Sequence, residues 1–197
     1  DMDQLYPWVG ETLRPATHVV AMSDYGFKML RRAGFENSTR IHHGVDPAVF
    51  QPLIGETHPA GWKVTKEELK ARWGFEEDAF VVGMVQMNRG VRKMIPHQLE
   101  MLRIFRDQNP DVKLRVWCHM LRDNPAEEGF DFNALAKAMG LDDVMVFPDR
   151  LDLLYGYEAV AWGRMPMLYN AFDVLLQATS SEGFGLPIIE AHACGVP

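Results

Sequence analysis

Residues 170–197 constrain the fold of this 197-residue chain more than any other stretch. Residues 170–180 are largely apolar and end in small polar residues, which is typical of a buried strand. A Gly-Phe-Gly turn at 183–185 then leads into an apolar helix start, with Glu182 and Glu190 on either side. A strand, a glycine turn and a helix in this order are typical of the sheet edge where α/β proteins bind nucleotides. We therefore expect a site for a ligand with a diphosphate and several hydroxyls, such as a nucleotide-sugar.

A chain of 197 residues could be one large domain or a domain and a half. From residue 80 onward, apolar runs alternate with helical patterns. Strands are expected at 80–86, 112–118, 144–147 and 173–178, and helices at 97–107, 133–139, 165–171 and 186–194. Such alternation predicts an α/β fold with a Rossmann-like, doubly wound parallel sheet that is covered on both faces.

The first 64 residues suggest a separate unit. A helix is expected at 3–14, a strand at 17–22, a helix after the N-cap Ser23, and a strand at 40–43. Three prolines and three glycines then fall within residues 44–64, which is typical of a linker. Residues 1–43 are accordingly predicted to be the tail of an N-terminal Rossmann-like domain. Residues 65–197 are predicted to form the nucleotide-sugar-binding domain, opened by a capping box at Thr65 and Glu68.

Composition narrows the class of partner. The net charge of −7 argues against nucleic acid, because binding to a phosphate backbone needs a basic face. No run approaches the roughly 18 apolar residues of a membrane span. The two cysteines, Cys118 and Cys194, form no C-x-x-C pair and suit a reducing compartment, so a cytoplasmic location is expected.

Ser181-Glu-Gly-Phe-Gly-Leu-Pro-x-x-Glu-Ala-x-Ala-Cys-Gly195 resembles the donor-site motif of the retaining glycosyltransferases of family 4, which have the GT-B fold. Residues 41–52, 82–93 and 168–174 resemble three further segments of that family in the same order. The resemblance covers roughly residues 15 to 197. It implies the C-terminal donor-binding domain of a GT-B enzyme, with the end of its acceptor domain. It also implies that the chain is truncated at both ends, lacks a last strand and is inactive by itself.

The resemblance assigns the diphosphate to two cations. Arg89 and Lys93 follow the expected strand at 80–86, at the carboxyl edge of the sheet. In the family, an Arg and a Lys in this segment hold the diphosphate without a metal, which implies a catalytic role for both residues on the leaving group. Arg92 is the alternative for the arginine role. A solvated helix start is the structural alternative for Arg92 and Lys93.

The resemblance also implies roles for the carboxylates of Glu182 and Glu190. Glu182 is implied as a catalytic residue near the hydroxyls of the donor sugar, and Glu190 as the partner of the ribose hydroxyls. The backbone groups implied to meet the donor belong to Gly183, Phe184, Gly185 and Leu186. Structurally, Glu182 could be a first-turn helix carboxylate and Glu190 an exposed helix residue. An unpaired carboxylate within the apolar run around Glu190 would however be costly.

Two further features bear on the ligand. Tyr157 and Trp162 lie in a segment that contacts the base in GT-B enzymes, and they could stack on a nucleobase or cover the sheet edge. No pair of histidines has metal-ligand spacing with a carboxylate, so no metal is expected. No cofactor is expected either, and the donor is a UDP- or GDP-linked sugar acting as a substrate.

These implications define an enzyme of the hexosyltransferase class that transfers a sugar with retention, by a front-face mechanism, to a sugar, lipid or protein acceptor. Peripheral membrane association through the absent domain is left open. A non-catalytic nucleotide-sugar-binding module or subunit is the first alternative. A dinucleotide-dependent oxidoreductase is the second, because Gly183-Phe184-Gly185 resembles the start of a Gly-x-Gly-x-x-Gly turn. Ile188 occupies the third glycine position, which argues against it.

Overall fold

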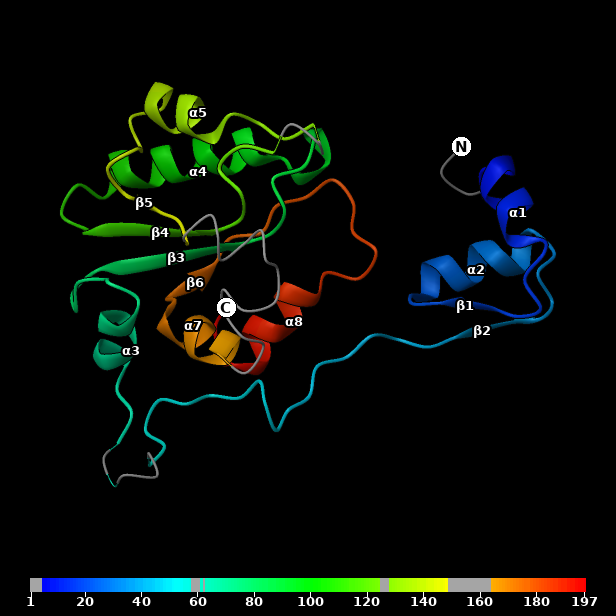
Figure 1. Cartoon of the computed structure of the whole chain (residues 1–197), viewed down its shortest axis with the longest axis horizontal. Helices are drawn as coiled ribbons and strands as arrows, with labels where there is room; N and C mark the ends of the chain where they lie inside the picture. Colours follow the sequence, from blue (N-terminus) through cyan, green and yellow to red (C-terminus); the bar gives the residue numbers. More distant parts are fainter. Residues whose placement is uncertain (1–4, 58–60, 62, 125–127, 149–163) are drawn as a thin grey trace. The chain divides into compact units, whose positions relative to one another are not determined.

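The computed structural model describes residues 5–57, 61, 63–124, 128–148 and 164–197 (Figure 1). The chain forms two compact units, one of residues 1–44 and 182–186 and the other of residues 45–181 and 187–197. Each unit contains a parallel sheet, so the predicted α/β class is confirmed. Within the described ranges, no helix is long and apolar enough to cross a membrane.

The first unit is small. Its elements are α1 (Pro7–Leu13), β1 (Val19–Ala21), α2 (Asp24–Arg32) and β2 (Ser38–Arg40). The side chain of Ser23 accepts a hydrogen bond from the Gly26 N–H at 3.0 Å, as expected of an N-cap. The two strands pair in parallel, and Val19, Ala21 and Leu30 form the core of this unit.

The strand β2 ends earlier than the sequence predicts. The expected strand at 40–43 was wrong in its bounds, since β2 covers Ser38–Arg40. The N–H of Ile41 still donates to the carbonyl of Ala21 at 2.9 Å. Beyond Ala21 the neighbouring strand stops, because Ser23 caps α2, and later residues therefore have no strand to pair with.

The second unit carries the larger sheet. Its elements are α3 (Lys66–Arg72), β3 (Phe80–Val85), η1 (Val91–Lys93), α4 (Ile95–Gln108), β4 (Leu114–His119), α5 (Phe132–Ala138), β5 (Met145–Val146), α7 (Met165–Ala171), β6 (Val174–Leu175) and α8 (Leu186–Ala193). Four parallel strands lie in the order β5-β4-β3-β6. The capping box predicted at Thr65 and Glu68 is present.

Both faces of this sheet are apolar, as a doubly covered parallel sheet requires. Val81 and Val85 face a core that includes α7 and α8, whereas Val82 and Met84 face a core that includes α4 and α5. Figure 1 shows these helix pairs on opposite faces of β3 and β4. Each core holds one buried free cysteine. They are Cys194 on the α8 side and Cys118 on the α4 side.

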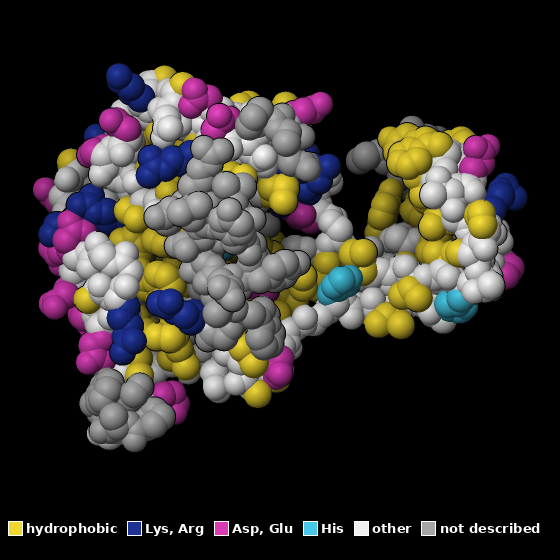
Figure 2. All heavy atoms as spheres, viewed as in Figure 1, with side chains coloured by type: hydrophobic (Ala, Val, Ile, Leu, Met, Phe, Trp, Pro, Cys, Tyr) yellow, Lys and Arg dark blue, Asp and Glu magenta, His cyan; other side chains and the backbone are white. Residues whose placement is uncertain are grey.

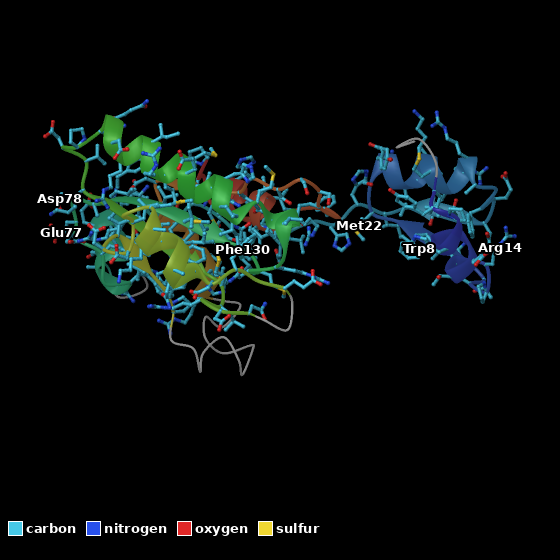
Figure 3. The ribbon with its side chains drawn as sticks, turned by 90° about the horizontal axis from the view of Figure 1, so that it is seen from above. Trp8, Arg14, Met22, Glu77, Asp78 and Phe130 are labelled. Carbon is cyan, nitrogen blue, oxygen red and sulfur yellow. The ribbon has the colours of Figure 1, made fainter. Side chains whose placement is uncertain are left out.

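Lysine and arginine side chains are intermingled with aspartate and glutamate over the surface of the second unit that Figure 2 displays. In Figure 3, Glu77 and Asp78 lie at the end of this unit where β3 begins, and Phe130 lies toward the other end. Strand β3 therefore runs from the Asp78 end toward the end where its following loop meets Phe130.

The segment predicted as a linker is packed where it enters the second unit. Phe50 is 3% exposed and joins the α7–α8 core. The buried side chain of Asn170 accepts a hydrogen bond from the Leu53 N–H at 2.8 Å and donates one to the Gln51 carbonyl at 3.0 Å. The predicted domain limits themselves stay a prediction.

Strand β6 is shorter than the predicted 173–178. Leu176 N–H still donates to the Gly83 carbonyl at 2.8 Å. Further along, the carbonyl of Ala178 accepts a hydrogen bond from the Gln98 side chain at 2.8 Å. The ladder between β3 and β6 ends where the backbone of the segment after β6 binds the side chain of Gln98 and no longer binds the backbone of β3.

An ionic cluster fixes the start of β6. The carboxylate of Asp173 binds Lys66 Nζ at 2.8 Å and Lys70 Nζ at 3.0 Å, and it accepts a hydrogen bond from the Val81 N–H at 2.8 Å. Burial alone would raise the pKa of Asp173, but hydrogen bonds from Lys66, Val81 and Lys70 together lower it. The carboxylate thereby joins α3, β3 and β6.

Asp173→Asn should lower the free energy of unfolding by about 3 kcal/mol, because it leaves two lysines of the cluster without their counter-charge. Because the folded pKa lies below the ordinary value of 3.8, the stabilisation is present above that value and is lost as the pH falls through the folded pKa. Urea unfolding between pH 7 and pH 2 measures both effects. Asp78→Asn, which removes an exposed ion pair with Lys113, is the control and should change the midpoint little. An equal loss in the two variants would contradict this account.

Gly83 in β3 allows the ring of Phe172 to pack directly against the strand backbone. A Cβ atom at this position would lie 2.2 Å from a ring carbon of the fully buried Phe172. Gly83→Ala should therefore cost about 1–3 kcal/mol by overpacking. Phe172→Leu in the same chain should recover part of that loss, since it makes room for the methyl group. Guanidinium unfolding of the single and double variants tests this, and purely additive losses would speak against the contact.

Candidate functional site

The site begins at the point where strand order reverses. Strands β3 and β6 are neighbours, yet the helices that follow them, α4 and α8, pack on opposite faces. In open parallel sheets, a crevice forms outside the carboxyl ends of two such strands, and ligands bind there. The loops after β3 and β6 are the two segments that carry the residues singled out from the sequence.

The loop after β3 is a tight turn. Gly90 and Met94 have positive φ values of 45° and 47°, and between them Val91–Lys93 form the short 3-10 helix η1. Arg89 is exposed, whereas Lys93 is only 7% exposed. Helix α4 starts at Ile95, two residues before the predicted start. Arg92 and Lys93 therefore precede the helix and do not form its first turn.

The turn is bound to the segment that leads toward α8. The carbonyl of Arg92 accepts hydrogen bonds from the Ser180 N–H and the Thr179 hydroxyl, both at 3.0 Å, and from the Ser180 hydroxyl at 3.3 Å. The guanidinium of Arg92 donates to the Ser181 carbonyl at 2.7 Å. We call these contacts the β3–β6 seam. Arg92, the alternative for the phosphate-binding arginine, thus contributes both its backbone and its side chain to the seam.

A pair of buried amides lies beneath the seam. Gln98 on α4 is fully buried and donates to the carbonyls of Lys93 at 2.7 Å and Ala178 at 2.8 Å. Its carbonyl oxygen accepts a hydrogen bond from Gln86 Nε2 at 3.0 Å. Gln86 is the residue directly after β3, so the pair links the end of this strand to both sides of the seam.

A third buried amide joins the loops after β3 and β4. Asn88 is fully buried, donates to the Phe130 carbonyl at 2.7 Å and accepts from the Phe130 N–H at 2.9 Å. The backbone carbonyl of Asn88 accepts from Asn124 Nδ2 at 3.0 Å. These contacts hold the backbone immediately before Arg89.

A pocket of about 330 Å³ opens at the carboxyl ends of β3 and β4. Its lining includes Gln86, His119, Asn124 and Pro187. Burial lowers the pKa of His119, so its imidazole is neutral over a wider pH range than an exposed histidine. Its Nδ1 atom is buried and has no hydrogen-bond partner within the described part of the chain.

Glu190 lies on α8 and is half-buried. One of its carboxylate oxygens accepts a hydrogen bond from the Tyr169 hydroxyl of α7 at 2.6 Å. The Tyr169 ring is fully buried between Phe50 and Phe172. Burial, and next the nearby Glu190 carboxylate, raises the pKa of Tyr169. The phenol therefore remains a donor and fixes the orientation of Glu190.

Residues 182–186 belong to the first unit. There the ring of Phe184 packs against His43, with 5.4 Å between ring centroids. Gly185 has a φ of 84°, which favours glycine. A Cβ atom on Gly183 would lie 3.3 Å from the sulfur of Met22. Glu182 is half-buried, and Leu186 is the first residue of α8.

The structure thus places Arg89, Lys93 and Glu190 on the two connections that follow the neighbouring strands β3 and β6. Their individual roles stay predictions, as do those of Glu182 and residues 183–186. Tyr157 and Trp162 lie outside the described residues.

Sequence reasoning missed Asn88, Gln98 and Tyr169. Gln98 carried a readable signal, because an amide at the spacing of Ile95, Leu99 and Leu102 occupies the apolar face of a helix. A polar side chain at a core position requires buried partners. The pairing of Tyr169 with Glu190 spans 21 residues and had no local signal.

No family model matches the chain. A relative from Arthrobacter sp. (strain FB24), a D-inositol 3-phosphate glycosyltransferase, is 26% identical over 168 residues, which cover 84% of this chain and 34% of the relative. Over most of its length the chain is thus similar in sequence to a glycosyltransferase. The chain spans about a third of the length of that relative.

Two solved structures share the fold of this chain. Anabaena Alr3699/HepE in complex with UDP has a TM-score of 0.63 at 21% identity, covering 92% of this chain and 44% of that protein. The C-terminal domain of the group 1 glycosyltransferase LpcC from Francisella tularensis has a TM-score of 0.51 at 20% identity, covering 78% of this chain and 68% of that domain. The second unit accordingly has the fold of a C-terminal GT-B domain.

The contact between Tyr169 and Glu190 should appear as a coupling free energy of about 1 kcal/mol in a double-mutant cycle of Tyr169→Phe and Glu190→Gln. Tyr169→Phe removes the hydrogen bond and Glu190→Gln removes the charge of its acceptor, while both changes keep the shape of the side chain. Urea unfolding of the four chains gives the coupling. The cycle of Tyr169→Phe with Glu100→Gln, on α4 across the sheet, is the control and should be additive. A Tyr169–Glu190 cycle that is also additive would disprove a charge-assisted contact between them.

Proposed function

We propose that this chain provides the nucleotide-sugar-binding domain of a glycosyltransferase that transfers a hexose from a UDP- or GDP-linked donor to an acceptor. The observation that carries the proposal is the switch point between β3 and β6, where a cationic turn adjoins the segment that leads into α8. The proposal assigns donor binding, rather than the complete transfer, to this chain.

The charges of the turn suit a diphosphate. Arg89 is exposed and Lys93 lies four residues along the chain, on a turn that the seam holds in place. Cleavage of the bond between sugar and phosphate increases the negative charge on the leaving group, so fixed cations favour the transition state over the ground state. Arg89 can bind phosphate oxygens bidentately, and Lys93 supplies a compact charge. These two cations would replace a metal ion in this role.

Glu190 suits the ribose. One of its oxygens accepts the Tyr169 hydroxyl, and a carboxylate has acceptor capacity for further hydroxyl donors. The pocket after β3 and β4 has room for part of a nucleoside, and Gln86 and Asn124 supply amide groups in its lining. The Anabaena protein with this fold was solved with UDP, which supports a uridine nucleotide as the first ligand to test.

We further propose that the transfer proceeds with retention of the anomeric configuration. Glu182 would contact the hydroxyls of the donor sugar, and backbone N–H groups of residues 183–186 would contact the phosphates. The departing phosphate would take the acceptor proton on the same face of the sugar. A non-catalytic binding module would share the donor site but release no sugar to an acceptor.

Thermal unfolding of the full chain tests the donor site. One of UDP, GDP and ADP at millimolar concentration should raise the Tm by a few degrees, because a ligand that binds only the folded chain stabilises it by mass action. EDTA should leave the shift unchanged. Arg89→Met should abolish most of the shift, whereas Arg72→Met, which replaces an exposed arginine on α3, should keep it. A shift with NAD alone, or one that is equal in the two variants, would refute the proposal.

A further inference from the structure

Gln98 is a polar residue at an apolar position. It lies on the buried face of α4 with Ile95, Leu99 and Leu102, and its side chain is completely inaccessible to solvent. A methionine or leucine would fill the same space without the cost of removing an amide from water. The amide must therefore be explained by its hydrogen bonds.

These hydrogen bonds use the whole amide group. A glutamine side chain has two N–H donors, and Gln98 directs them to the carbonyls of Lys93 and Ala178 at 2.7 and 2.8 Å. Its oxygen accepts from Gln86 Nε2 at 3.0 Å, while the reverse contact from Gln98 Nε2 to Gln86 Oε1 is longer, at 3.3 Å. The two close acceptors are 85 residues apart in sequence, one in η1 and the other after β6.

We infer that Gln98 is a positioning residue for the diphosphate subsite, an inference that rests on the function proposed above. Gln98 binds the backbone carbonyl of Lys93 itself, so it fixes the rotation of the peptide unit from which this cation projects. By the same amide it holds Ala178, which immediately precedes the seam residues Thr179 to Ser181. A single side chain thereby sets the spacing between the cationic turn and the segment leading into α8.

Loss of the Gln98 amide would leave two buried backbone carbonyls without their hydrogen bonds. Without the N–H donors, the carbonyls of Lys93 and Ala178 lie in an apolar environment with no replacement partner from position 98, and unpaired buried carbonyls are strongly disfavoured. The turn and the segment after β6 must then shift to find other donors. Because the hydrogen bonds of Arg92 join the same two segments, the seam is expected to loosen with them.

The test compares Gln98→Met with Leu102→Ala. Methionine keeps the length and apolar stem of glutamine, so the first variant removes the hydrogen bonds but little volume. Leu102 is buried one turn further along α4, so the second variant weakens the core without touching the seam. Both are studied as the full chain, under conditions where each is folded.

The first measurement needs no ligand. Hydrogen exchange at the Ser180 amide, which donates to the Arg92 carbonyl, should become at least tenfold faster in Gln98→Met relative to the core amides of β3. Leu102→Ala should leave this ratio unchanged. Equal ratios in the two variants would overturn the inference.

The second measurement distinguishes a specific effect on the diphosphate subsite from a general disruption of the pocket. The dissociation constant of UDP or GDP, whichever the unmodified chain binds more tightly, should rise about tenfold in Gln98→Met, as expected for loss of one charge-assisted phosphate contact. That of the parent nucleoside, uridine or guanosine, should change less than threefold, because Gln86 remains in the pocket wall. Equal losses for nucleotide and nucleoside would overturn the inference. If the unmodified chain binds neither nucleotide while Ser180 exchange responds as expected, the proposed function fails and the structural coupling stands.

Discussion

The arrangement of the second unit depends on how β6 is held against β3. These strands pair over only two residues, Val82 with Val174 and Gly83 with Leu175. So short a ladder is reinforced from outside. Asp173 binds the backbone of β3 and two lysines of α3, and the missing side chain of Gly83 lets the Phe172 ring close over the sheet. An ion cluster and a glycine thus compensate for the few hydrogen bonds of the strand pair.

This pairing creates the site. Because β6 joins the sheet beside β3, the connections that leave the two strands start at the same edge and diverge to opposite faces. The chain then binds them together with polar side chains: Arg92 at the surface and Gln98 in the core. For the proposed diphosphate-binding turn such support matters, since a cation stabilises a transition state effectively only when its position is fixed before the reaction. The cations lie on the turn after β3, and they are supported by Arg92 of the same turn, by Gln98 of α4 and by the segment after β6.

The sequence predicted those parts of the fold that local rules govern. Helix α7 has the predicted bounds, and the caps at Ser23 and Thr65 form as their residue types indicate. Strand ends were predicted less well, because the extent of β2 and β6 depends on where the neighbouring chain stops or turns to a side chain. The cationic turn and Glu190 could be proposed from the resemblance of their segments to motifs of a known family. The contact of Tyr169 with Glu190 could not, since it spans 21 residues without a local signal, whereas the position of Gln98 on the apolar face of α4 did indicate buried partners.

Each face of the larger sheet contains one buried cysteine whose reaction with an alkylating reagent would report opening of the core on that face. Burial raises the pKa of the Cys194 thiol to about 11, and it also raises that of Cys118. Both thiols are therefore inert to alkylation while their surroundings are closed. Cys118 lies in the α4–α5 core and Cys194 in the α7–α8 core, so their alkylation rates follow different opening events. The alkylation rate of Cys118 thus reports opening of the core beside α4, the helix that holds Gln98. The alkylation rate of Cys194 reports opening of the core beside α8, the helix that holds Glu190.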